Sequence, residues 1–319
     1  TYSEAYYNMG NALKDQGKLE EASEAYKKAI SINPNNAEAY NNMGVTLQKQ
    51  GKAEEAIEAY EKAVSIRPDN AEAYNNMGVT LRGVIFNKPS RELQQTIASL
   101  LDRKTSVRPK DIASAAISLL KFEPILQKHL ELVDAALIKS PADITSDLSK
   151  LPLLIKLMSV CPLPDLELER IFTNLRRSIL SNVSSLKGQS EELLGIQSAL
   201  ALHCFTNEYI YSTTAEEEKD LRTLEKIVIN AFKNNEQPTP EALLTLASYK
   251  AFNQYDWCNL LVVTNHIKAV FTRQVEEPKK EEKLKQDLPI LEEITDSISS
   301  KVREQYEESP YPRWVNLGF

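Results

Sequence analysis

A motif of about 34 residues occurs twice near the amino end of the chain and begins a third time, and it restricts the possible folds more than any other feature. The residues shared by all three copies are Tyr6, Met9 and Gly10, then Tyr40, Met43 and Gly44, and then Tyr74, Met77 and Gly78. A helical unit of this length cannot bury its own apolar side, so neighbouring copies must stack on one another. The motif therefore predicts an array of similar units.

Each full copy contains the residues of a helical hairpin. Gly44 in the first helix lets the second helix come close, and Tyr60 of the second helix fills the space between the two. Gly51 ends the first helix and turns the chain, and Pro68 stops the second one. We therefore expect two complete helix pairs, followed by a third that begins on the same pattern.

These residues resemble the tetratricopeptide repeat (TPR) in both full copies. The resemblance implies an all-α fold, a right-handed TPR superhelix of two full repeats and a divergent third, in which the first helix of each pair lines a concave groove. It also implies that the groove binds an extended peptide or a protein partner. The residues at the implied groove positions are Tyr7, Asn8, Asn11, Lys14, Asn41, Asn42, Gln48, Asn75, Asn76 and Arg82.

Three of these groove residues, Asn8, Asn42 and Asn76, stand at equivalent positions one repeat apart. In the family such asparagines bind the backbone of a peptide, for which an amide is suited because it carries both a donor and an acceptor. The alternative is that each asparagine belongs to the common repeat pattern and bonds neighbouring helices. Both interpretations stay open, as does whether groove specificity comes from glutamates or from Lys14 and Arg82.

The chain after the repeats has no common period. The third copy loses the motif after Leu81, and we interpret 89–101, which has apolar residues on one face, as a displaced second helix that closes the third repeat. Glycine is rare after this point and prolines mark the turns, so the pattern predicts an irregular helical domain. Its expected helices cover 112–120, 125–138, 141–160, 166–180, 190–211, 215–234, 239–250 and 265–275.

We expect three domains from this organisation. Residues 1–104 form the TPR array with its displaced capping helix, and 105–288 form the irregular helical domain. Residues 289–319 form a last helix and an extended aromatic tail that leads toward an absent domain. The charged run at 276–286 is expected to be an exposed helix or a linker.

The composition, 42% apolar and 26% charged, is typical of a soluble globular protein. A net charge of −7 without a basic stripe argues against nucleic-acid binding. No stretch has the roughly 20 apolar residues that span a bilayer, and the first residues do not resemble a signal peptide. The three cysteines, Cys161, Cys204 and Cys258, form no CxxC pair, so we expect free thiols in a reducing compartment and place the protein in the cytoplasm.

No group of residues has the spacing of a catalytic or metal site. His203 and Cys204 are adjacent, so on a helix they point to different faces and neither can activate the other. Glu208 is poorly spaced from His203 for a metal helix, and no second histidine is near. Neither the dinucleotide-binding nor the P-loop glycine motif occurs. We therefore expect no catalytic residue, no metal and no cofactor in this chain.

The carboxy-terminal residues carry a second resemblance. QYEESPYPRW at 305–314, with the charged stretch before it, resembles the segment that leads into the catalytic domain of certain bacterial proteins. Those proteins are composed of TPR repeats, a helical middle region and a class I S-adenosylmethionine-dependent methyltransferase domain, and 81–104 and 199–211 resemble the middle region. The resemblance implies S-adenosylmethionine as the cofactor of a longer parent protein, whose cofactor loop and parallel sheet would lie after Phe319.

The sequence favours an interaction scaffold in which the repeats recruit a peptide or protein, as the substrate-recruiting, non-catalytic part of a methyltransferase. One alternative is that the helical domain forms a wall of the substrate cleft in such an enzyme. Another is a self-association module, a weak homo-oligomer formed through the first helix, which starts at Thr1 without the polar outer cap of a terminal repeat.

Overall fold

The structure, a computed structural model, describes residues 1–103, 107–134, 140–185 and 191–286. Within these ranges the regular structure is helical and no strand occurs, so the predicted all-α fold is confirmed. Contacts divide the chain into two units. The first comprises Thr1–Gln127 with Pro152–Leu157, and the second comprises Lys128–Leu151 with the described residues from Met158 onward. The last helix and aromatic tail predicted for 289–319 lie outside the described residues.

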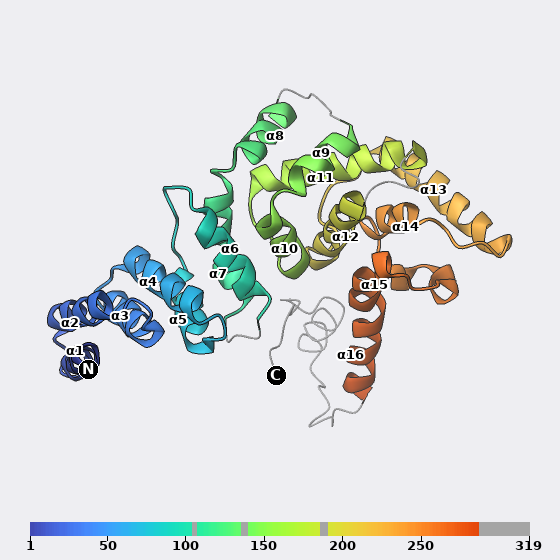
Figure 1. The fold of residues 1–319 in the computed structure, drawn as a ribbon. Helices are drawn as coiled ribbons and strands as arrows, with labels where there is room; N and C mark the ends of the chain where they lie inside the picture. Colours follow the sequence, from blue (N-terminus) through green and yellow to red (C-terminus); the bar gives the residue numbers. More distant parts are fainter. Residues whose placement is uncertain (104–106, 135–139, 186–190, 287–319) are drawn as a thin grey trace, which may run out of the picture. The chain divides into compact units, whose positions relative to one another are not determined.

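The first unit begins with five helices in the predicted order. They are α1 (Tyr2–Asp15), α2 (Leu19–Ile32), α3 (Ala37–Lys49), α4 (Ala53–Ile66) and α5 (Ala71–Leu81). Each helix packs against the next, and Figure 1 shows them as consecutive neighbours at the amino-terminal end. These are the two helix pairs and the start of a third that the repeated motif predicts.

The two complete hairpins are closed by a glycine in one helix and a tyrosine in the other. A Cβ atom on Gly10 would lie 2.6 Å from Cε1 of Tyr26, and one on Gly44 would lie 2.5 Å from Cε1 of Tyr60. Both tyrosines are fully buried. Gly51, at the turn between α3 and α4, has a φ of +77°, a conformation that glycine adopts without steric cost. The helices therefore approach as closely as the motif predicts.

The third hairpin is built differently. The residue opposite Gly78 is Val107, whose Cγ2 would lie 2.8 Å from a Cβ atom at that glycine. Val107 precedes α7 (Pro109–Leu120), which packs on α5 and also on α6 (Arg91–Leu101). The displaced helix expected at 89–101 is thus present as α6, but the group that fills the space beside Gly78 comes from the segment leading into α7.

The expected domain boundaries at 104 and 288 stay predictions. Contacts alone place α6 and α7 in the same unit as the repeats. They do not show which stretches fold independently, and that is what a domain boundary states.

The second unit has no repeating pattern. Its helices, with those that join the units, are α8 (Pro124–Asp134), α9 (Pro141–Leu148), α10 (Pro152–Val160), α11 (Leu166–Asn182), α12 (Glu191–Thr206), α13 (Ala215–Lys233), α14 (Pro240–Ala247), α15 (Asn265–Phe271) and α16 (Glu277–Gln286). Short helical turns at Val183–Ser185, Phe252–Gln254 and Asp256–Leu260, and a π-helical stretch at Thr272–Glu276, join some of them. None of the helices in the described ranges is long and apolar enough to cross a membrane.

Two predicted helices are shorter than expected. The helix predicted for 141–160 is divided into α9 and α10, because Pro152 has no N–H to continue a helix from α9 and instead starts the next one. The helix predicted for 190–211 ends at Thr206, since Glu208 and Tyr209 have positive φ values of 60° and 57°. The run at 276–286 is mainly α16, in which the side chains of residues 279–285 are exposed.

Aromatic and charged groups share the core of the second unit. Trp257 stacks on Tyr255 with their ring centroids 4.5 Å apart. Arg176 and Glu217 are buried, with 1% and 2% of their side chains exposed. Glu217 accepts hydrogen bonds from the hydroxyl of Tyr249 at 2.8 Å and from the backbone N–H of Thr214 at 2.9 Å. A buried carboxylate is stable only when such partners replace water.

Replacing Gly44 with alanine should destabilise the repeats by about 1–3 kcal/mol, because the new methyl group meets the buried ring of Tyr60. The matched control is Gly195→Ala in α12, where no atom beyond the chain neighbours and the local helix backbone lies within 4 Å of the added carbon and the helix gains up to about 1 kcal/mol. Thermal unfolding followed by circular dichroism measures both. Equal effects of the two substitutions would contradict the close approach of α3 and α4.

Glu217→Gln should lower the free energy of unfolding of the second unit by about 2 kcal/mol at neutral pH, the scale of hydrogen bonds to a charged group. Burial alone would raise the pKa of Glu217, but the bonds from Thr214 and Tyr249 and the charge of Arg177 outweigh it and lower the pKa. The stability is therefore present above the ordinary carboxyl pKa and is lost as the pH falls through the folded-state pKa.

Urea unfolding followed by Trp257 fluorescence, in a Trp314→Phe background, measures this difference. The exposed neighbour variant Glu216→Gln is the control and should unfold like the parent protein. A difference between Glu217→Gln and the parent that stayed constant from pH 7 to pH 3 would show that the carboxylate charge is not the source.

Candidate functional site

The predicted groove residues lie on α1, α3 and α5, and hydrogen bonds join several of them from one repeat to the next. The amide of Asn42 in α3 donates to the hydroxyl of Tyr7 at 3.1 Å and to Oδ1 of Asn11 at 2.9 Å, both in α1. The amide of Asn76 in α5 donates to Oδ1 of Asn41 in α3 at 3.1 Å. The bonds Asn42 to Tyr7 and Asn76 to Asn41 span the same 35 residues, so they form one repeated contact.

This contact is the one required by the helix-bonding interpretation of the asparagine series. It uses amide donors of Asn42 and Asn76. In the described part of the chain, Oδ1 of Asn42 accepts no hydrogen bond. Asn8 stands at the same repeat position in α1, is exposed and makes no such bond among the described residues. A peptide-binding role for the series stays a prediction, and Asn8 is the member whose amide is fully available for it.

The buried tyrosines of the hairpins also reach this set. The hydroxyl of Tyr26 donates to Oδ1 of Asn11 at 2.7 Å, and that of Tyr60 donates to Oε1 of Gln48 at 3.4 Å. Each tyrosine thus fills the space beside a glycine and holds a polar side chain of the first helix. In each hairpin, one tyrosine side chain therefore packs the two helices together and also bonds a groove residue.

The other predicted groove residues differ in burial and in their partners. Lys14 and Asn75 are half-buried, and Arg82 is exposed. Arg82 pairs with Asp111 of α7 at 3.4 Å, so its charge is partly used within the first unit. Asn41 is buried and donates to Glu72 at 3.1 Å, a partner that sequence spacing did not suggest.

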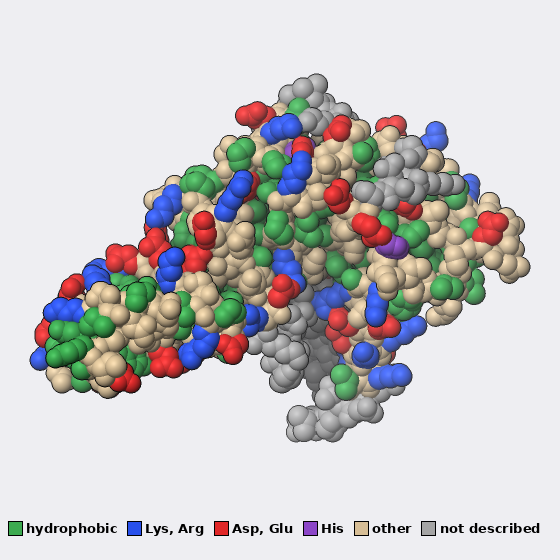
Figure 2. All heavy atoms as spheres, viewed as in Figure 1, with side chains coloured by type: hydrophobic (Ala, Val, Ile, Leu, Met, Phe, Trp, Pro, Cys, Tyr) green, Lys and Arg blue, Asp and Glu red, His purple; other side chains and the backbone are tan. Residues whose placement is uncertain are grey.

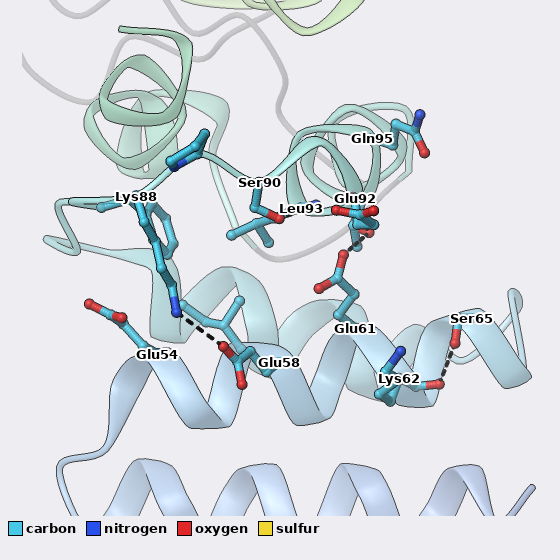
Figure 3. A pocket seen from close by; sticks show the side chains of 14 residues that line it. Glu54, Glu58, Glu61, Lys62, Ser65, Lys88, Ser90, Glu92, Leu93 and Gln95 are labelled. Atoms are coloured by element: carbon cyan, nitrogen blue, oxygen red, sulfur yellow. Dashed lines mark hydrogen bonds and ion pairs between the residues drawn. The ribbon is translucent and has the colours of Figure 1, made fainter. Parts of the chain in front are cut away.

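A second feature of the first unit is a cavity of about 590 Å³ between α4 and α6 (Figure 3). Its lining residues come from α4, from the loop after α5 and from α6. The sequence analysis missed it, although the glutamates of α4 repeat at helical spacing, because the facing residues come from a part of the chain about 30 positions away. On the face seen in Figure 2, acidic and basic side chains are interspersed over the amino-terminal helices.

In the second unit, His203 and Cys204 are buried in α12 and point to different partners. Nε2 of His203 lies 2.6 Å from the hydroxyl of Tyr211. Burial lowers the pKa of His203 to about 4 and raises the pKa of the Cys204 thiol to about 12. At neutral pH the thiol is therefore protonated and the imidazole is neutral. Among the residues that the structure describes, no three His, Cys, Asp or Glu side chains gather as metal ligands.

Comparison with known proteins identifies the repeats. Residues 10–51 and 49–82 match the family model of the TPR repeat. Repeats of this family generally mediate protein–protein interactions and are not catalytic. No curated protein matches the chain. The amino-terminal part of the chain is thus a TPR array, as the motif indicates.

Glu61→Gln should raise the melting temperature at pH 8. Burial raises the pKa of Glu61, with the Thr96 hydroxyl opposing this and the charge of Glu92 adding to it. The folded state therefore prefers the neutral carboxyl, and the parent protein gains stability as the pH falls through that raised pKa. The difference between variant and parent should shrink as the pH approaches 4.5. Glu55→Gln, an exposed position on the same helix, is the control, and an equal gain there would refute a special environment at Glu61.

Proposed function

We propose that this chain, whose residues 10–82 match TPR repeats, is a protein-interaction module. It binds an extended peptide or protein segment across α1, α3 and α5. The observation that carries the proposal is the row of amide side chains at one repeat position on three neighbouring helices. An amide can donate to a backbone carbonyl and accept from a backbone N–H, so it recognises a peptide group regardless of side-chain sequence.

The binding would be of modest affinity. An array of this size offers a small area, and an extended peptide loses conformational freedom when it binds. Asn8 would bond the peptide with its whole amide, and Asn42 with its acceptor, since its two donors already bond Tyr7 and Asn11. Exposed Val79 of α5 offers apolar surface to the partner side chains.

Asn8→Ala should weaken binding about tenfold, which corresponds to about 1.4 kcal/mol, without lowering the melting temperature. Asn42→Ala should weaken binding and also lower the melting temperature, because it removes two hydrogen bonds between repeats. Peptides selected from a random dodecamer library on the immobilised full chain serve as probes, and isothermal titration calorimetry measures their affinity.

The matched control is Asn35→Ala, an exposed asparagine in the loop between α2 and α3. Its affinity should equal that of the parent protein. Unchanged affinity of Asn8→Ala and Asn42→Ala, with a lower melting temperature for the second alone, would assign the asparagine series to structure and overturn the proposed binding face.

We also propose that the module is the substrate-recruiting, non-catalytic part of a longer bacterial methyltransferase. The support is the resemblance of 81–104, 199–211 and 305–314 to the middle region and linker of such proteins. A longer reading frame that encodes a glycine-rich strand-turn-helix after Phe319 would support the proposal, and a different downstream domain would overturn it. The chain itself should not bind S-adenosylmethionine in a titration; binding would favour the cleft-wall alternative.

Exposed apolar side chains on α1 bear on self-association, and the cysteines bear on the location of the protein. Tyr2 and Met9 of α1 are exposed by 83% and 52%, which is the observation that favours weak self-association through this helix. Light scattering at several concentrations distinguishes this alternative from a monomer. Among the described residues, the buried thiols of Cys161, Cys204 and Cys258 form no disulfide bond, which supports a proposed location in a reducing compartment, the cytoplasm.

A further inference from the structure

The cavity between α4 and α6 extends along α4, and none of the proposed groove residues lines it. Along α4 its lining runs from Glu54 to Ser65. At 1.5 Å per residue this distance is about 16 Å of helix axis, the length of about five residues of extended chain. Its volume of about 590 Å³ lies within the usual range of binding pockets, about 300–1,000 Å³. The shape fits a short extended peptide.

The base of the cavity is apolar. Ile57 of α4, Phe86 of the preceding loop and Leu93 of α6 line it, and each is almost fully buried by its neighbours. An occupant with a methylene stem would remove the remaining exposed apolar surface from water.

The sides of the cavity are acidic. Glu54, Glu58 and Glu61 project from α4, and Glu92 projects from α6 above Glu61 (Figure 3). The lining cations are Lys62 and Lys88. The charge of the lining side chains is therefore net negative, which favours a cationic occupant.

One end of the cavity already holds a cation from the chain itself. Lys88 reaches from the loop to α4, where its Nζ lies 3.5 Å from Glu58 (Figure 3). At the other end Lys62 also lines the cavity, but within the described part of the chain it forms no ion pair with a lining glutamate. Among the described residues, Glu54, Glu61 and Glu92 form no ion pair, and Glu61 accepts one hydrogen bond, from the hydroxyl of Thr96 at 3.1 Å.

The surroundings of Glu61 destabilise a negative charge on its carboxyl. Burial disfavours its charged form, and the nearby charges of Glu92 and Glu58 add to the effect, so its pKa is raised. Lys62 offsets only part of this. A cation placed between α4 and α6 would relieve the repulsion and restore the charged form of the carboxyl.

We propose that this cavity is a second peptide-binding site, which takes an arginine or lysine side chain of an extended partner segment. The stem of the basic residue lies over Ile57, Phe86 and Leu93, and its charged end lies between Glu61 and Glu92, as Lys88 lies beside Glu58. The site uses α4 and α6, so it is independent of the face proposed on α1, α3 and α5.

Two pools of fluorescein-labelled pentapeptides test the proposal on the full chain. One pool has arginine at its centre and random flanking residues, and the other has citrulline, which has nearly the same shape but no charge. Fluorescence anisotropy at low salt should show at least tenfold tighter binding of the arginine pool. The affinity should fall with added salt, because both partners are charged.

The double variant Glu61→Gln/Glu92→Gln should bind the arginine pool at least tenfold more weakly than the parent, while its melting temperature is no lower than that of the parent. Glu55→Gln, on the same helix but outside the cavity, and Asn8→Ala, on the other proposed face, should bind within twofold of the parent. Equal binding of the two pools, or unaltered binding by the double variant, would overturn the proposal. Binding of spermidine without binding of the arginine pool would also overturn it, in favour of a small-cation site.

Discussion

The contact between a glycine of one helix and a tyrosine of the next is the interaction on which the amino-terminal structure depends. Gly10 with Tyr26, and Gly44 with Tyr60, bring the two helices of a hairpin close enough that any side chain at the glycine would overlap the ring. The same tyrosines donate hydrogen bonds to Asn11 and Gln48 of the first helices. Closing the hairpin therefore also sets the positions of polar residues on the face proposed for binding.

At the end of the array a residue other than tyrosine faces the glycine. At Gly78 the facing residue is Val107, which has no hydroxyl to bond the first helix and which belongs to the approach to α7. Since α7 packs against α5, α6 does not take the usual place of a second helix. The cavity beside α4 lies where α6 and the loop before it meet the repeats. The acidic cavity is thus formed where residues that follow the loss of the repeat pattern meet α4.

The two proposed faces differ in which of their polar groups already have a hydrogen-bond or ion-pair partner within the fold. On the α1, α3 and α5 face, Asn42 and Asn76 bond the preceding repeat, and Asn8 is exposed. In the α4 and α6 cavity, Lys88 pairs with Glu58, whereas Glu61 has a neutral hydroxyl as its hydrogen-bond partner. The first face offers amides to a peptide backbone, and the second offers carboxylates to a basic side chain. In the second unit, by contrast, buried Arg176 donates to the backbone carbonyl of Ser212, and buried Glu217 accepts from the hydroxyl of Tyr249.

The sequence by itself determined the elements whose signals are local. The repeated glycines, tyrosines and prolines located α1 to α5, and the helix expected at 166–180 begins where α11 begins, at Leu166. It overestimated the helix at 141–160, although Pro152 was visible, and the one at 190–211, whose end depends on the positive φ of Glu208. Only the tertiary structure decided that Val107 faces Gly78, that Asn42 bonds Tyr7, and that Glu61 meets Thr96. Those partners lie about 30 or more residues apart, and side-chain periodicity within one helix carries no information about which distant helix packs against it.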